Sequence, residues 1–110
     1  MQTTQSVLQG VMVVSAKGRL DSNTSAILDS ALSGEAKAAP KLIIDLSGVD
    51  YVSSAGLRIL LKAAKLAMAS KQKLALAGLA PQVREVFDVS GFTKLFTLAA
   101  DPEAALAVIG

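Results

Sequence analysis

Short apolar runs separated by turn residues open the chain, and they predict a pair of strands followed by a helix. Residues 6–9 and 11–16 have the apolar content of two short strands, and Gly10 between them indicates a hairpin. Residues 27–32 carry their apolar side chains at the spacing of a helix. Gly34 follows as the expected helix end.

The central part of the chain has the pattern of a buried strand followed by an amphipathic helix. Residues 41–46 include three consecutive aliphatic side chains, as a strand buried on both faces does. Residues 47–50 have the composition of a turn, and a long helix is expected from about residue 54 to residue 69. The apolar face of this helix consists of Leu57, Leu60, Leu61, Ala64 and Met68, and its basic face of Arg58, Lys62 and Lys65. Such a helix is typical of one lying on a sheet.

The rest of the chain completes the sheet. Residues 73–77 predict a further strand, which a right-handed crossover through the long helix places parallel to the strand at residues 41–46. Pro81 suits the first turn of another helix, residues 95–98 predict a last strand, and Asp101 can cap a last helix. This order predicts an α/β fold, with a mixed sheet of four to five strands and about four helices packed mainly on one side.

The composition fits one globular domain over residues 1–110, with neither a nucleic-acid partner nor membrane insertion. Apolar residues make up 52% of the chain, which is enough for a packed core at this length. The net charge of +2 is too small to indicate nucleic-acid binding, and no apolar stretch is long enough to span a bilayer. Because the polar N-terminus lacks the features of a signal peptide, a cytoplasmic protein is expected.

The chain has no cysteine and no histidine, which removes most of the chemistry of small enzymes. Thiolate nucleophiles, imidazole bases, Ser-His-Asp triads and most transition-metal sites all need one of these residues. Catalysis would have to rest on Asp, Lys and Ser alone. We therefore expect a protein that is not an enzyme and that holds no metal or cofactor.

Paired serines, Ser53 and Ser54, stand at the expected start of the long helix. A serine there can cap the helix with its side-chain oxygen, or it can accept a phosphoryl group at an exposed helix N-terminus. Gly56 is expected to permit close backbone packing in the same turn. Asp45 and Asp50 flank the preceding loop without a basic or metal-ligating companion, so a turn role is favoured over paired-carboxylate chemistry.

The segment around these serines, residues 45–57, resembles the signature of STAS domains. Residues 18–21, Gly-Arg-Leu-Asp, stand where that family has a Gly-x-Leu-Asp turn before its first helix. Residues 81–87 and 90–92 are similar to its third helix and the turn that follows. The resemblance covers nearly the whole chain, so it implies a single STAS domain. Within that family, the chain resembles the bacterial anti-sigma factor antagonists in particular.

The resemblance implies a regulatory binding protein. Antagonists of this kind bind a serine-kinase anti-sigma factor and so release a sigma factor for transcription. The kinase phosphorylates one serine at the start of the second helix, which inactivates the antagonist, and a serine phosphatase resets the switch. The kinase supplies ATP and Mg²⁺, so no cofactor of the antagonist's own is implied. A monomer or weak homodimer is expected.

The family pattern implies Ser54 as the phosphorylated residue, with Ser53 as the second choice. Ser53 occupies a position where many antagonists have an aspartate. The partner-binding surface is expected to include Asp21, Ser53, Ser54, Gly56 and Arg58. Asp21 is a helix-cap or turn residue in a segment that the family places beside the acceptor, and Arg58 follows Ser54 by one helical turn.

A second role on the same fold is the main alternative. The chain can be a stand-alone STAS subunit of an ABC transporter for lipids or other solutes, or a module of a larger signalling assembly. The intact serine turn, residues 45–57, favours the antagonist role, because a transporter subunit would not need a serine that can be phosphorylated there.

Overall fold

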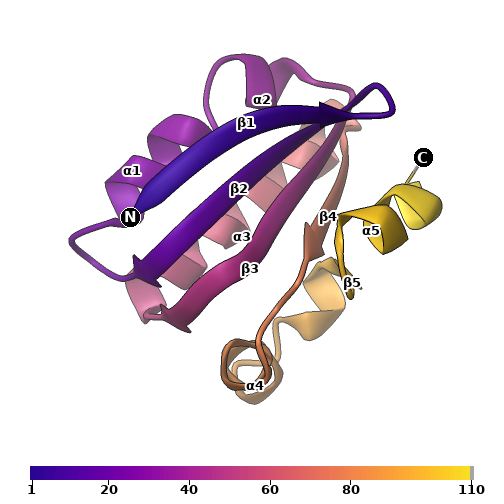
Figure 1. Cartoon of the computed structure of the whole chain (residues 1–110). Coiled ribbons are helices and arrows are strands. Elements are labelled where there is room, and N and C mark those ends of the chain that lie inside the picture. Colours follow the sequence, from indigo (N-terminus) through magenta and orange to yellow (C-terminus); the bar gives the residue numbers. More distant parts are fainter. Residues whose placement is uncertain (110) are drawn as a thin grey trace.

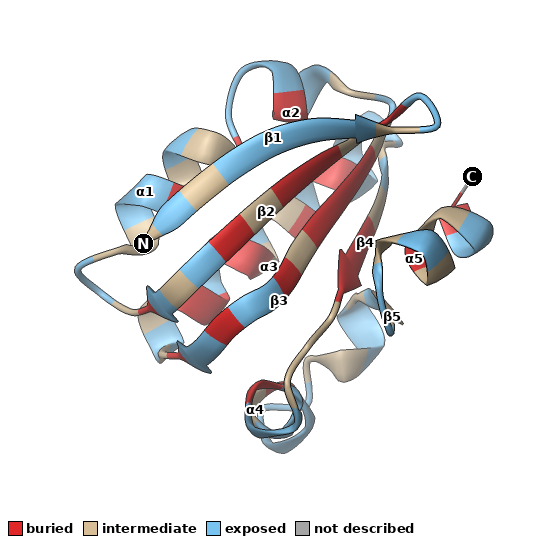
Figure 2. Cartoon of the chain, viewed as in Figure 1, coloured by how far each residue is buried: buried red, intermediate tan, exposed pale blue. Residues whose placement is uncertain are grey.

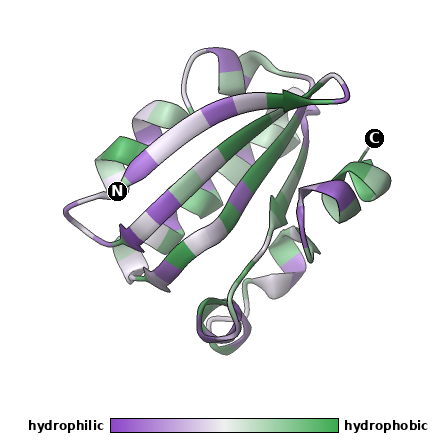
Figure 3. Cartoon of the chain, in the orientation of Figure 1, coloured by the Kyte–Doolittle hydropathy of each residue, from purple (hydrophilic) through white to green (hydrophobic). Residues whose placement is uncertain are grey.

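A hairpin begins the sheet of the computed structural model, which describes residues 1–109 (Figure 1). Strand β1 (Gln2–Leu8) pairs antiparallel with β2 (Val11–Leu20), as the sequence predicts, although both strands are longer than the apolar runs suggest. The first half of β1, residues 2–5, is polar (Figure 3), so only its pairing with β2 reveals these residues as part of the strand.

A parallel βαβ unit forms the middle of the sheet. Strand β3 (Lys41–Val52) pairs in parallel with β2 and with β4 (Lys73–Ala77), and α3 (Ser54–Ser70) connects β3 to β4. The parallel pairing and the connecting helix are as predicted. The prediction of a turn at residues 47–50 is wrong, because β3 continues through these residues. Two register shifts against β2 accommodate this polar, glycine-containing stretch, and Val49 within it is buried.

The C-terminal part completes a sheet of strand order β1-β2-β3-β4-β5. Helix α4 (Pro81–Val89) leads to a short 3₁₀ turn, η1 (Thr93–Leu95), and then to β5 (Thr97–Ala99), which is parallel to β4. The predicted strand thus begins later than residue 95. Helix α5 (Pro102–Ile109) is capped by Asp101, whose carboxylate accepts the Ala104 N–H at 2.7 Å.

The helix predicted after β2 is two short helices. Helix α1 (Ser25–Ala31) ends before Gly34, and α2 (Glu35–Ala38) begins after it. Gly34 has a φ of 63°, a backbone angle that turns the chain between the two helices. The bend lets Leu32 and Ala36 both reach the core.

Two hydrophobic clusters lie on the two faces of the sheet (Figure 2). The larger one lies between the sheet and α1, α2, α3 and α4, and the smaller one lies under α5. Helices therefore cover mainly one face, as predicted. The smaller cluster consists of Val11, Val13, Ile43, Ala75, Ala77, Ala105 and Ile109. Within residues 1–109, none of the helices has the length and apolarity needed to cross a membrane.

Candidate functional site

The first turn of α3 is fixed by Ser53, which is the N-cap residue. Its backbone is extended, and its hydroxyl oxygen accepts the Gly56 N–H at 3.3 Å. Its own N–H donates to the Leu20 carbonyl at 2.8 Å, so the helix start is tied to the end of β2. Of the two serines that the sequence offers as caps, the structure therefore uses Ser53.

Ser54 is the first residue inside α3, and its side chain is exposed. Among residues 1–109 the structure gives its hydroxyl no hydrogen-bond partner. The two adjacent serines thus differ, because one hydroxyl is engaged in the helix cap and the other faces solvent. Ser54 is free to react with or bind another molecule.

Gly56 brings the start of α3 onto the end of β2. A β-carbon built at this position would lie 2.8 Å from the Leu20 carbonyl oxygen and 2.5 Å from its Cγ, closer than such atoms approach. This confirms the close packing predicted for Gly56. The residue is buried, so it shapes the site from beneath and does not line its surface.

Asp21 forms a turn beside this helix start. Its carboxylate accepts the N–H groups of Asn23 and Thr24 at 3.0 and 3.1 Å, and the Thr24 hydroxyl at 3.2 Å. Partial burial raises the pKa of Asp21, but these hydrogen bonds and the charge of Arg19 together lower it below its usual range. The turn role is as predicted, whereas the N-cap position of α1 belongs to Thr24.

Arg19 and Tyr51 form a stacked pair that the sequence did not predict. The Arg19 guanidinium carbon lies 4.1 Å from the centre of the Tyr51 ring, and its Nε lies 3.7 Å from the Asp21 carboxylate. The two residues are register partners on β2 and β3. The sequence predicts a strand that ends at residue 46, and such a strand cannot place Tyr51 opposite Arg19. Only a strand that extends to Val52 brings the two side chains together.

Basic side chains follow Ser54 along α3. Arg58 is exposed and lies four residues after Ser54, which places both on the same side of the helix. Lys62, one turn further on, is held by Asp29 of α1 at 3.2 Å. Asp45 accepts the Ser47 N–H at 3.0 Å, but Asp45 and Asp50 both lie within β3, so the turn role predicted for them is wrong. No group of acidic residues within the described chain, 1–109, is arranged to hold a metal ion.

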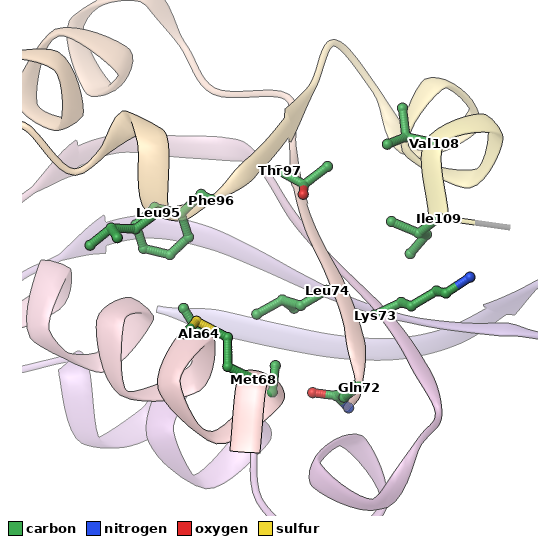
Figure 4. Close-up of a pocket in the computed structure, with 11 residues that line it drawn as sticks. Ala64, Met68, Gln72, Lys73, Leu74, Leu95, Phe96, Thr97, Val108 and Ile109 are labelled. Carbon is green, nitrogen blue, oxygen red and sulfur yellow. The ribbon is translucent and has the colours of Figure 1, made fainter. Parts of the chain in front are cut away.

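A groove of about 350 Å³ lies at the other end of α3, between that helix, the start of β4, η1 and α5 (Figure 4). Met68 lines it and is 73% exposed, although its spacing predicts a buried position. The three-residue β5 pairs only with Ala75–Ala77 and leaves this part of the sheet edge uncovered. The lining includes Lys73 as its one charged residue, so the groove lacks an acid–base pair and is separate from the serine turn.

Comparison with known proteins agrees with this geometry. The family model described as "Mlab, STAS domain" matches residues 4–98. A protein of Bordetella bronchiseptica named as an anti-sigma factor antagonist, BtrV, is 36% identical over 108 residues, which are 97% of this chain and 93% of that protein.

Solved structures share the whole fold. An anti-sigma factor antagonist from Mycobacterium paratuberculosis has a TM-score of 0.88 at 29% identity, over 98% of this chain and 92% of that one. A sulfate transporter family protein from Wolinella succinogenes has a TM-score of 0.81 at 17% identity, over 94% and 88% of the two chains. The second likeness is one of fold alone, so the fold occurs in proteins of different roles.

Proposed function

This chain belongs to the STAS domain family, and we propose that within it the protein is an anti-sigma factor antagonist. In its unphosphorylated form it binds a serine-kinase anti-sigma factor, so that a sigma factor is released for transcription. It is a binding protein and not an enzyme, it acts in the cytoplasm as a monomer or weak homodimer, and it needs no cofactor of its own.

The observation that carries this proposal is the exposed hydroxyl of Ser54 at the first position of α3, which has no hydrogen-bond partner within residues 1–109. We assign it as the residue that the kinase phosphorylates and a serine phosphatase restores. Ser53 is the weaker candidate, because its hydroxyl oxygen already accepts the Gly56 N–H. Modifying Ser53 would alter the existing cap of α3, whereas modifying Ser54 disturbs no hydrogen bond among residues 1–109.

A phosphate on Ser54 is compatible with the fold. It would add about −1.5 to −2 charges at neutral pH, next to the N–H groups and positive dipole end of α3. Arg58 on the same side of the helix supplies a further positive charge. The modification therefore acts mainly on the partner, which meets an added dianion that is costly to desolvate.

A second candidate is a subunit of a lipid or solute transporter. The Wolinella neighbour, which is named as a sulfate transporter family protein, is the observation that favours it. The two roles predict different bound proteins, so one isolation experiment separates them.

The test is to isolate tagged parent protein and its Ser54→Ala variant from source cells, and to identify phosphopeptides and co-purifying proteins by mass spectrometry. The proposal expects phosphate on Ser54 of the parent and a kinase-type anti-sigma factor enriched with the variant. Unmodified Ser54 together with transporter subunits would instead establish the second candidate.

A further inference from the structure

The stacked pair of Arg19 and Tyr51 lies at the edge of the proposed switch. Figure 1 shows the ends of β2 and β3 beside the start of α3, where Ser53 and Ser54 stand. The next register pair, Leu20 and Val52, is buried against the helices. Because side chains alternate along a strand, Arg19 and Tyr51 project from the opposite face of the sheet.

Neither side chain of the pair covers the protein's own core. The Arg19 side chain is 61% exposed and Tyr51 is 42% exposed. On this face of the sheet, α5 packs over a different region, around Val13 and Ile43. Exposed Tyr and Arg side chains are over-represented among the residues that dominate protein–protein binding energy.

The pair is held in place before any partner binds. The ring of Tyr51 supports the guanidinium from one side, and Asp21 approaches its Nε. Asp21 is itself fixed by the N–H groups of Asn23 and Thr24. A guanidinium has five N–H donors, so most of them remain directed to solvent. Because the pair is already ordered, binding loses less conformational entropy.

From this arrangement we infer that Arg19, supported by Tyr51, docks an acidic side chain of the anti-sigma partner. An arginine fork matches the two oxygens of a carboxylate, and the ring of Tyr51 accommodates the apolar stem beside it. The inference rests on the proposed function and names the chemistry that this antagonist recognises. It also makes Arg19 and Tyr51 specificity residues, since a partner lacking the acid leaves the solvent-directed N–H donors of Arg19 without an acceptor in the interface.

A partner carboxylate bound at Arg19 would be repelled by a phosphate on Ser54. The Ser53 N–H donates to the Leu20 carbonyl at 2.8 Å, so the start of α3, with Ser54, adjoins the strand end that carries Arg19. Two negative groups repel each other there, and the repulsion strengthens as the interface excludes water. Release of the phosphorylated form then follows from charge, without a change of fold.

The test measures the affinity of the purified anti-sigma kinase, identified as above, for the full-length variants by calorimetry. Arg19→Gln and Tyr51→Leu are each expected to weaken binding about tenfold or more. Lys17→Gln is the matched control, because Lys17 is an exposed cation two residues earlier on β2, and it should change the affinity less than about twofold. Arg19→Lys should not restore the parent affinity.

Three further readouts separate this role from a structural one. Tyr51 is the only tyrosine, and the chain has no tryptophan, so its fluorescence reports on this site alone. Unchanged melting temperatures would show that the variants fold. Raising the salt concentration should weaken the parent complex more than the Arg19→Gln complex.

The outcomes distinguish this inference from the proposed function. If Ser54→Asp loses binding while Arg19→Gln and Tyr51→Leu bind within twofold of the parent, the docking role is wrong and the switch stands. If no kinase-type anti-sigma factor binds the parent protein, the proposed function fails and the inference fails with it.

Discussion

Ser53 and Ser54 are adjacent and chemically identical, yet only one of them supports the fold. Ser53→Ala removes the cap of α3 and should lower the free energy of unfolding by about 0.5–2 kcal/mol. Ser54→Ala removes an exposed hydroxyl without a partner and should change it by less than about 0.5 kcal/mol. Urea denaturation of both variants measures the difference, and equal losses would contradict the assignment of the cap.

A substitution at Gly56 tests whether α3 must pack against β2 as closely as the structure shows. In most helices glycine to alanine is stabilising, by up to about 1 kcal/mol. Here the added methyl meets the Leu20 carbonyl oxygen at 2.8 Å, and backbone cannot move aside as a side chain does. Gly56→Ala should therefore destabilise the protein, by about 1–3 kcal/mol in urea denaturation. A more stable variant would show that the contact yields easily.

The sequence placed the serine turn correctly but not everything around it. Helical spacing and the paired serines predict the start of α3 within one residue, since these signals are local. The extent of β3 is not local, because residues 47–50 read as a turn and become a strand only through pairing with β2. That pairing creates the contact between Arg19 and Tyr51, which no pattern in either segment reveals.

At the scale of elements, α5 packs on the second face of the sheet. Ala105 is fully buried there against β-strand residues, whereas Ala107 on the same helix is exposed. Ala105→Asp buries a charge without a partner and should cost about 2–4 kcal/mol. Ala107→Asp, the matched control, should cost less than about 0.5 kcal/mol. Similar urea midpoints for the two variants would contradict the packing of α5.

At the scale of the whole molecule, the proposed switch residue lies outside the contacts that hold α3 in place. Helix α3 is capped at Ser53, packed through Gly56 and tied to α1 by the ion pair of Lys62 with Asp29. A phosphate on Ser54 is added outside these contacts. If the proposed switch acts at the binding surface alone, the phosphorylated and unphosphorylated forms should have closely similar melting temperatures.

The most direct test compares the affinity of the purified anti-sigma kinase for this protein with and without phosphoserine incorporated at residue 54. Calorimetry at about 0.15 M ionic strength keeps the charge effects in the physiological range. The phosphoserine form is expected to bind about a hundredfold more weakly or worse, with its fold unchanged. Equal affinity of the two folded forms would contradict the central claim that Ser54 is the switch.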